Sequence, residues 1–338
     1  MKRAFLGESL MSEEEDDDLG IKPGTVIDSS KANYVVINLI GEGGFGAVYN
    51  PFYLGYTTEK IRKKEYAMKV EKKIEQRRHS KLKMEIAILK LVSGQRKQSH
   101  FTTIVDRGKK SNVFLSSYGV FTVPTSMGAG IQCLEACEDL HKHGFIHRDL
   151  KPANYACGLG DKRRVVYILD FGIARKIYEC ERRTKNTTTN RERFDLLPLH
   201  AIKNVEMGPK DDCESWFYLI LDITVPGVNV NVCRFYCGSQ KSEKDDVLKV
   251  KEQMRSPERR DAAFGGLPCK EELSKMLDYI DSLKYHDHVD YEFIYKLSEQ
   301  VRKGAKSAGG DIKDLYDWGK NHRTYRDYHY KGTVVSEP

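Results

Sequence analysis

The pattern of apolar and polar positions divides the chain into a β-rich first part and a mostly helical second part. Residues 34–40 form a run rich in β-branched side chains that ends at glycines, which predicts a strand. Residues 66–70 form a second short apolar run and predict another strand. The polar stretch 50–64 between them is expected to be a long turn. Further strand material is expected at 113–120 and 165–169.

Helical periodicity appears first at Leu82, Ile86 and Leu89, which recur at i, i+4 and i+7 and predict a helix over 79–93. Similar apolar spacing predicts later helices over residues 128–143, 211–224, 269–283 and 289–303. This order predicts an α+β protein, in which a small antiparallel sheet with one helix precedes a larger, mostly helical part.

The chain has 338 residues, of which 40% are hydrophobic, and can bury a sizeable core. Residues 1–21 are acidic and polar and are expected to form a disordered tail. One two-lobed domain is expected over 22–320, with a smaller lobe at about 32–118 and a larger lobe at about 121–320. Residues 321–338 are expected to form a polar C-terminal tail.

The net charge is +7, and the basic residues cluster at Lys60–Lys64, Lys72–Arg78 and Arg182–Arg193. Such clusters favour acidic partners, although the first two are also typical of solvated surface faces. No zinc-finger spacing or aromatic RNA-binding motif is present, so nucleic-acid binding is not indicated.

No apolar run approaches the roughly 18 residues that a membrane helix needs, and the N-terminal residues do not show a signal-peptide pattern. The eight cysteines are scattered and form no Cys-x-x-Cys pair. Reduced thiols are therefore expected, together with a location in the cytosol or nucleus.

The strongest chemical signal is the stretch His147–Asn154, which lies between a helical pattern and a β-rich run and is expected to be a loop. Asp149 can accept a proton from a hydroxyl nucleophile, and Lys151 beside it can neutralise charge on a transferring phosphoryl group. Asn154 has the reach and the carbonyl oxygen to ligate a magnesium ion. Any one of these residues alone is most often a surface group, but the ordered stretch is specific.

A glycine-rich stretch follows the first predicted strand. Glycines there let backbone amides approach phosphate oxygens without a clash from Cβ. The residues expected to hold the nucleotide are Gly41, Gly43, Gly44, Gly46 and Val48. A glycine set alone is a weak signal, but here it lies between two strands, which suits a hairpin folded over a nucleotide. No helix follows at once, which argues against a dinucleotide-binding fold.

The second predicted strand carries Lys69 among apolar neighbours. Taken alone, it would be an edge lysine that reaches water, but with the glycine-rich stretch it is interpreted as the group that holds the α- and β-phosphates. Ala67 is small enough to cover an adenine ring. Glu85 on the next predicted helix is the candidate for an ion pair with Lys69, on grounds of order and spacing.

Asp170 follows an apolar strand and precedes Phe171 and Gly172. It is expected to be the second magnesium ligand, on the ion that bridges the β- and γ-phosphates. Further along, Asp211 and Asp212 begin an apolar helix. An aspartate at this position can accept the backbone N–H groups of the 147–154 loop and fix its shape.

With these residues in place, the chain resembles a eukaryotic protein kinase, and most of all the tau-tubulin kinase-like branch of the casein kinase 1 group. The resemblance covers about residues 22–320. It is carried by residues 41–49, 65–70, 145–154, 169–175 and 204–218, with a further similarity over 267–295. It implies a two-lobed protein kinase fold and the activity of a protein serine/threonine kinase with ATP and Mg²⁺ as cofactors. The expected partners are protein substrates, often with acidic or already phosphorylated residues near the target hydroxyl.

Two departures from this family leave an alternative open. From Glu85 to Asp149 there are 64 residues, fewer than the family usually has, and the deficit falls on the hinge between the lobes. The family's Gly-Thr-x-Arg-Tyr-Ala-Ser element ahead of Asn204 is replaced by the sequence of residues 190–198. The alternative is a catalytically weak or inactive kinase-fold module that binds ATP or other proteins.

The segment 173–205 is expected to line the substrate groove beside Asp149. Its basic residues include Arg182, Arg183, Lys185, Arg191 and Arg193. Arginine binds phosphate through two parallel hydrogen bonds, so the segment is interpreted as a site for acidic or phosphorylated residues. The alternatives are a solvated loop and an internal dock for phosphorylated Thr187–Thr189.

Overall fold

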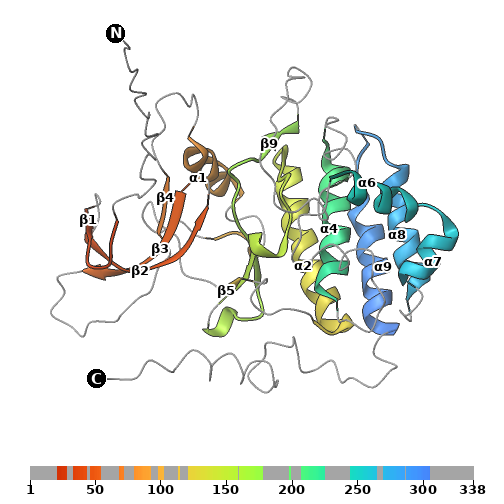
Figure 1. Ribbon diagram of the computed structural model, residues 1–338, viewed down its shortest axis with the longest axis horizontal. Helices are drawn as coiled ribbons and strands as arrows, with labels where there is room; N and C mark the ends of the chain where they lie inside the picture. The colour runs from red at the N-terminus through yellow and green to blue at the C-terminus, as the bar shows by residue number, and fades with distance from the viewer. Residues whose placement is uncertain are drawn as a thin grey trace, which may run out of the picture.

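A computed structural model of the chain describes most of the two regions that the hydrophobic pattern separates (Figure 1). The described residues are 21–28, 33–43, 46–54, 68–71, 80–92, 98–102, 113–114, 121–158, 160–177, 198, 207–224, 244–264, 269–285 and 287–304. They form an antiparallel sheet with one helix and a larger, mostly helical part, as the sequence predicts.

The first part is a four-stranded antiparallel sheet in the order β1-β2-β3-β4. Its strands are β1 (Val26–Asp28), β2 (Asn33–Gly43), β3 (Gly46–Leu54) and β4 (Met68–Glu71). Val36, Ala47, Tyr49 and Met68 are buried together in one apolar cluster within this sheet. The prediction of a polar turn from residue 50 is wrong for 50–54, because the backbone of β3 stays paired with β2 as far as Leu54.

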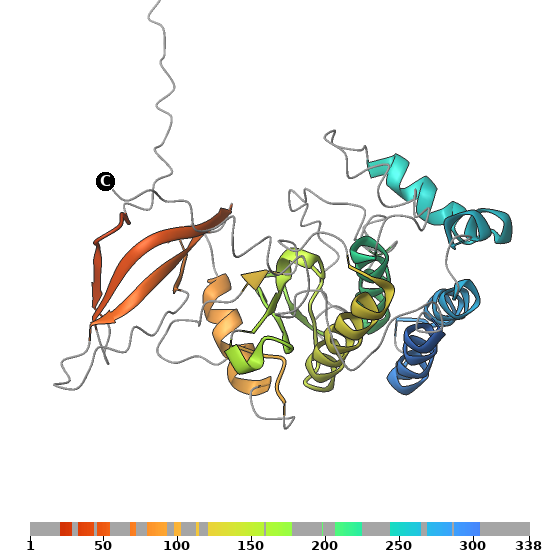
Figure 2. The same ribbon diagram turned by 90° about the horizontal axis from the view of Figure 1, so that it is seen from below.

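Helix α1 (Lys81–Val92) packs against β4 and lies between the sheet and the helical part (Figures 1 and 2). Ile88, Leu89 and Val92 are buried, whereas Met84 and Leu91, to one side of this buried face, are exposed. The helix predicted over 79–93 is therefore present.

Five short strands flank the loop that begins at His147 and the segment that contains Asp170. They are β5 (Val113–Phe114), β6 (Phe145–Ile146), β7 (Tyr155–Cys157), β8 (Val166–Ile168) and β9 (Arg175–Lys176). Strands β5, β7 and β8 form one sheet, and β6 pairs with β9. β6 leads into the loop that begins at His147, and β8 ends two residues before Asp170. Of the strand and hinge expected over 113–120, residues 115–120 lie outside the described part of the chain.

The second part is helical. It contains α2 (Val123–Lys142), α4 (Pro209–Ile223), α6 (Lys244–Gln253), α7 (Pro257–Phe264), α8 (Lys270–Ser282) and α9 (Tyr291–Gly304). The prediction that the helix before the loop begins at residue 128 is wrong. It begins at Val123, because Pro124 lies in the first turn, where a backbone N–H is not needed. Helices α6 and α7 were not predicted.

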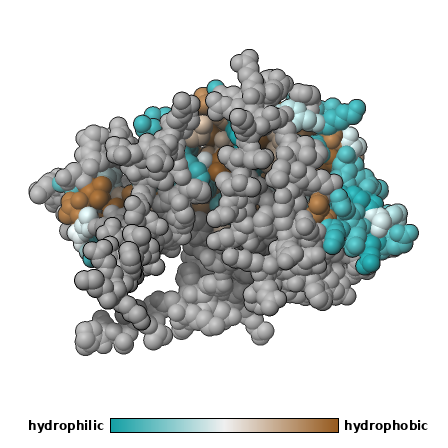
Figure 3. Space-filling model, turned by 45° about the horizontal axis from the view of Figure 1, so that its top comes forward, coloured by the Kyte–Doolittle hydropathy of each residue, from teal (hydrophilic) through white to brown (hydrophobic). Residues whose placement is uncertain are grey.

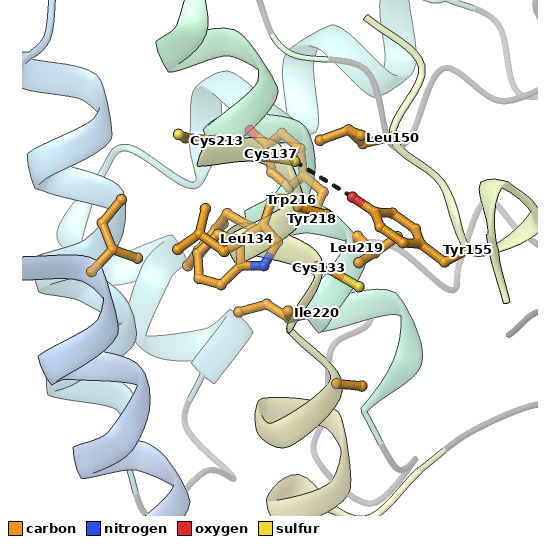
Figure 4. Close-up of a cluster of buried hydrophobic side chains, with 14 of the residues drawn as sticks. Cys133, Leu134, Cys137, Leu150, Tyr155, Cys213, Trp216, Tyr218, Leu219 and Ile220 are labelled. Atoms are coloured by element: carbon orange, nitrogen blue, oxygen red, sulfur yellow. Dashed lines mark hydrogen bonds between the residues drawn. The ribbon is translucent and has the colours of Figure 1, made fainter. Parts of the chain in front are cut away.

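Helices α2 and α4 cross at close range in the centre of this part (Figure 4). Trp216 Nε1 donates to the backbone oxygen of Gly130 over 2.7 Å. A Cβ atom at Gly130 would lie 2.6 Å from Ile220 Cγ2, so only glycine fits this crossing. Cys137 Sγ and Tyr155 Oη, 3.5 Å apart, join α2 to β7. Almost every residue of α4 is buried, so the start of α4 is fixed firmly in the core.

The described cysteines are all free and buried, and burial raises the pKa of each of these thiols: Cys133, Cys137, Cys157, Cys213 and Cys269. They are packing groups in the protonated state. Hydrophilic side chains cover the end of the molecule formed by α6 to α8, and a small apolar group lies over the sheet end (Figure 3). Among the described residues, no helix is both long and apolar enough to cross a bilayer.

Candidate active site

Lys69 lies at the centre of the candidate site, on β4 and opposite Val48 of β3. Its Nζ atom is 2.9 Å from Glu85 Oε2 and 2.9 Å from Asp170 Oδ1. The ion pair predicted between Lys69 and Glu85 is therefore present. Glu85 is almost fully buried, so its charge needs this partner. One ammonium group joins α1 to the segment after β8.

Asp170 is held ionised by this contact. Burial alone would raise its pKa, but the charge and the hydrogen bond of Lys69 outweigh this effect and lower the pKa to about 2. The Gly172 amide also donates to Oδ1, over 3.3 Å. Both contacts use Oδ1, so among the described residues Oδ2 is the oxygen left to face a cation. The backbone of Asp170 has φ 62°, a left-handed conformation that directs the side chain toward Lys69.

The loop residues Asp149, Lys151 and Asn154 contact one another directly. Lys151 Nζ is 3.0 Å from Asp149 Oδ2. Asn154 Nδ2 donates to the backbone oxygen of Asp149 over 2.8 Å and to Oδ2 over 3.0 Å. These bonds use the amide nitrogen of Asn154, which leaves its carbonyl oxygen as a possible metal ligand. They also leave Asp149 Oδ1 available for an incoming hydroxyl group among the described contacts.

The loop is anchored to the start of α4 by Asp212. Its Oδ2 atom accepts the His147 amide over 2.6 Å, and its Oδ1 atom accepts the Arg148 amide over 2.8 Å. Arg148 has φ 72°, so Asp212 stabilises a strained left-handed residue directly before Asp149. The expected role of an aspartate at this helix start is confirmed for Asp212, whereas Asp211 accepts the Gly208 amide over 2.7 Å.

Asp212 is itself oriented by His141 on α2, whose Nε2 atom lies 2.8 Å from Oδ2. Burial would raise the pKa of Asp212, but bonds from His141 and from the His147 backbone lower it. Since the carboxylate accepts, His141 Nε2 carries a proton. In the neutral ring Nδ1 then accepts from the Tyr291 hydroxyl group, which hydrogen-bonds it. A chain of bonds thus runs from α9 to the loop.

The loop and the Asp170 segment are also joined through His147. Its Nε2 atom lies 3.0 Å from the Leu169 oxygen. Its ring meets the edge of the Phe171 ring at 5.3 Å between centroids, and Phe171 in turn lies 6.0 Å from Phe101. His147 and Phe171 are fully buried. This apolar contact holds Asp149 and Asp170 in one rigid arrangement.

The described glycines lie where the sequence predicts a hairpin. Gly43 pairs with Gly46 at the end of β2 and β3, and Gly41 pairs with Val48. Gly44 and Ala67 lie outside the described residues, as do the basic residues expected beside Asp149, within 178–197. Their predicted contacts with nucleotide and substrate stay predictions.

Three residues that support the site were not found from the sequence. Glu71 contacts the start of α1, and His141 and Tyr291 extend the chain of bonds from Asp212. Ser80, directly before the amphipathic run, was a usable signal for the start of α1, because serine is a preferred N-cap residue. No local pattern marks His141 or Tyr291, since their contacts join distant parts of the chain.

Comparison with known proteins agrees with this geometry. The family described as "Protein kinase domain" matches residues 34–192, the part that holds Lys69, Glu85, Asp149, Asn154 and Asp170. A putative serine/threonine-protein kinase of Caenorhabditis elegans, ZK507.3, is 28% identical over 327 residues, covering 89% of this chain and 78% of that protein. The serine/threonine-protein kinase spe-6 of the same organism is 26% identical, covering 93% and 83%. A probable serine/threonine-protein kinase of Dictyostelium discoideum is 23% identical, covering 89% and 58%.

The antiparallel sheet with its single helix and the helical part beyond it correspond to the two lobes of that family. The chain therefore has the protein kinase fold, and the matched domain together with these relatives supports a protein serine/threonine kinase.

Proposed function

We propose that the chain is an active kinase that transfers the γ-phosphate of ATP to serine or threonine hydroxyl groups of proteins. The observation that carries this proposal is the position of Lys69 Nζ, 2.9 Å from both Glu85 and Asp170. The two carboxylates fix the orientation of the Lys69 ammonium group, and its side chain is only partly exposed to solvent. It can exchange part of this contact for phosphate oxygens when a nucleotide binds.

The donor set fits a magnesium nucleotide. Asp170 offers one carboxylate oxygen and Asn154 one amide oxygen, and magnesium prefers oxygen ligands. Among the described residues, no cluster of three or more His, Cys, Asp or Glu side chains could hold a metal by itself. This suits an ion that takes its remaining ligands from phosphate and water. A bound magnesium ion would be held by Asp170 and Asn154 and would supply positive charge to neutralise the phosphate groups.

Asp149 is the residue that receives the proton of the substrate hydroxyl group. Lys151 and Asn154 bond one carboxylate oxygen, so the carboxylate cannot rotate freely and the other oxygen can receive the hydroxyl proton. Lys151, which is about one-third exposed, lies close enough to offset charge on the transferring phosphoryl group. The protein thus supplies position, proton acceptance and fixed charges.

We also propose the finer assignment to the tau-tubulin kinase-like branch of the casein kinase 1 group, with acidic or primed substrates. The motif similarity over 204–218 and the basic residues over 182–193 support it. A primed peptide and its unprimed twin should be compared in the wild type and in an Arg191→Ala, Arg193→Ala variant. Selective loss on the primed peptide is expected. Equal loss on both peptides, or no loss on either, would reject phosphate recognition.

The activity itself is tested by transfer from γ-labelled ATP to casein in the presence of magnesium. Label on serine or threonine is expected in acid hydrolysates. A thermal melt with and without millimolar Mg-ATP should accompany it, because a ligand at a hundredfold excess over its Kd stabilises a protein by about 2.7 kcal/mol. Stabilisation without transfer would favour the inactive binding module, and absence of both would reject nucleotide binding.

A further inference from the structure

Glu71, the last residue of β4, bonds the start of α1. Its Oε1 atom accepts the Lys81 amide over 2.9 Å, and its Oε2 atom accepts the Leu82 amide over 3.0 Å. The Ser80 hydroxyl group also donates to Oε2. Ser80 Oγ in turn accepts the Lys83 amide over 3.1 Å, as an N-cap side chain does. Glu71 therefore makes three of the bonds that begin this helix.

The contact is favourable for reasons of charge as well. The first amides of a helix have no partner within the helix, and its N-terminus carries a partial positive charge. Helix α1 has no acidic residue in its own first turn. Glu71 supplies that negative charge from the neighbouring strand, so this part of the stabilisation is present only when the helix lies against β4.

Glu71 lies two residues after Lys69, on the same face of β4. Two residues of strand span about 6.8 Å. Along α1, the four residues from Lys81 to Glu85 span about 6 Å. The spacings match, so the strand and the helix are joined at two parallel points. Glu71 bonds the first turn, and Lys69 bonds Glu85 one turn later.

We propose that Glu71 is a positioning residue, which fixes α1 against β4 so that Glu85 meets Lys69. Without the Glu71 bonds, α1 can slide or rotate, and the ion pair at Lys69 forms less often. The same end of α1 borders the Asp170 segment, since a Cβ atom at Gly172 would lie 3.4 Å from Lys81 Cβ. A displaced first turn would therefore also disturb Asp170. The consequence for catalysis rests on the proposed phosphotransfer activity, whereas the consequence for α1 does not.

The experiment compares Glu71→Gln with Asp287→Asn in the full chain. Asp287 is exposed in the turn before α9, and its carboxylate likewise accepts a backbone amide, that of Lys284, over 2.7 Å. Both changes keep size and remove charge, but only one touches α1. Hydrogen exchange of the α1 amides after the first turn is expected to become about tenfold faster in Glu71→Gln and to stay unchanged in Asp287→Asn.

The second measurement is phosphotransfer activity in a double-mutant cycle that combines Glu71→Gln with Glu85→Gln. If Glu71 acts through Glu85, Glu71→Gln lowers kcat/KM for ATP about tenfold in the wild type and less than about twofold in the Glu85→Gln background. Should Glu71→Gln fail to fold, Ser80→Ala removes one of the same bonds. It must then show the same pattern with a smaller change.

The proposal is overturned if α1 exchange is unchanged in Glu71→Gln, whatever the activity. It is also overturned if kcat/KM falls by the same factor in both backgrounds, which would indicate a general loss of stability. A wild-type protein without phosphotransfer would reject the proposed function alone. The exchange measurement would still decide whether Glu71 positions α1.

Discussion

Asp212→Asn tests how the loop around Asp149 is held. The wild-type carboxylate accepts three N–H groups, from the backbones of His147 and Arg148 and from the ring of His141. An amide keeps one acceptor oxygen and places an NH₂ group where the other oxygen was. If the oxygen stays with His147 and His141, the NH₂ group faces the Arg148 amide, and donor meets donor.

The cost follows from these contacts. A hydrogen bond to a charged group contributes about 1.5–3 kcal/mol, and a buried donor left without a partner costs about 1–3 kcal/mol. The expected loss in unfolding free energy is therefore about 2.5–6 kcal/mol. The bond that is lost is the one to Arg148, whose φ of 72° is strained. The loop should relax there and move Asp149, and a misplacement of about 1 Å can lower kcat about a hundredfold.

Urea unfolding and steady-state kinetics of the Asp212→Asn variant measure both effects, with Asp287→Asn as the exposed control, for which a loss below about 1 kcal/mol is expected. The pH dependence of the unfolding free energy provides a second test of the Asp212 contacts.

The folded pKa of Asp212 is lowered, so its charge stabilises the fold above the unfolded pKa of about 3.9. This contribution is lost as the pH falls through the folded pKa. The stability difference between wild type and variant should be constant from about pH 5 upward and shrink below about pH 4. A loss under about 1 kcal/mol at pH 7, or an unchanged kcat, would refute the role given to Asp212.

Three further outcomes are expected. Tyr291→Phe removes the donor to His141 and should cost about 1–3 kcal/mol in urea unfolding and lower kcat. Gly130→Ala places a Cβ atom 2.6 Å from Ile220 Cγ2 and should cost about 1–3 kcal/mol in urea unfolding. Asp170→Asn should abolish both phosphotransfer and the magnesium-dependent part of ATP stabilisation in a thermal melt, because it removes a ligand and a partner of Lys69.

Matched controls separate these effects from general damage. Tyr295→Phe removes a half-buried bond to Glu138 away from the loop and should leave kcat unchanged. Gly304→Ala adds a Cβ atom with no neighbour within 4 Å and should be nearly neutral. If either control matches its partner variant, the stated contact is not the cause.

The sequence predicted the elements that have long, regular apolar faces. The ends of helices α1, α8 and α9 lie within two residues of the predicted ends, because a buried stripe repeats over several turns. Strands β6 and β9 have two residues each, too few for any period to be visible. Helix α6 was missed because most of its residues are charged and its packing depends on the rest of the protein.

The residues of the candidate site likewise include some that local sequence spacing predicts and some that it does not. Asp149, Lys151 and Asn154 could be predicted because their spacing within one loop determines their contacts. Glu71 and Tyr291 could not, because their importance depends on which backbone end or side chain the fold brings to them. Tyr291 meets His141 across 150 positions of sequence. Tertiary contacts of this kind leave no local pattern.

The central claim is that Asp149 receives the hydroxyl proton during phosphotransfer, while nucleotide binding depends on other residues. The most direct test measures label transfer from γ-labelled ATP to casein and the Mg-ATP shift in melting temperature, for the wild type and for Asp149→Asn. The wild type should transfer label to serine or threonine, and Asp149→Asn should lose transfer and keep the thermal shift. Transfer by Asp149→Asn at the wild-type rate, or loss of the thermal shift together with transfer, would contradict the account.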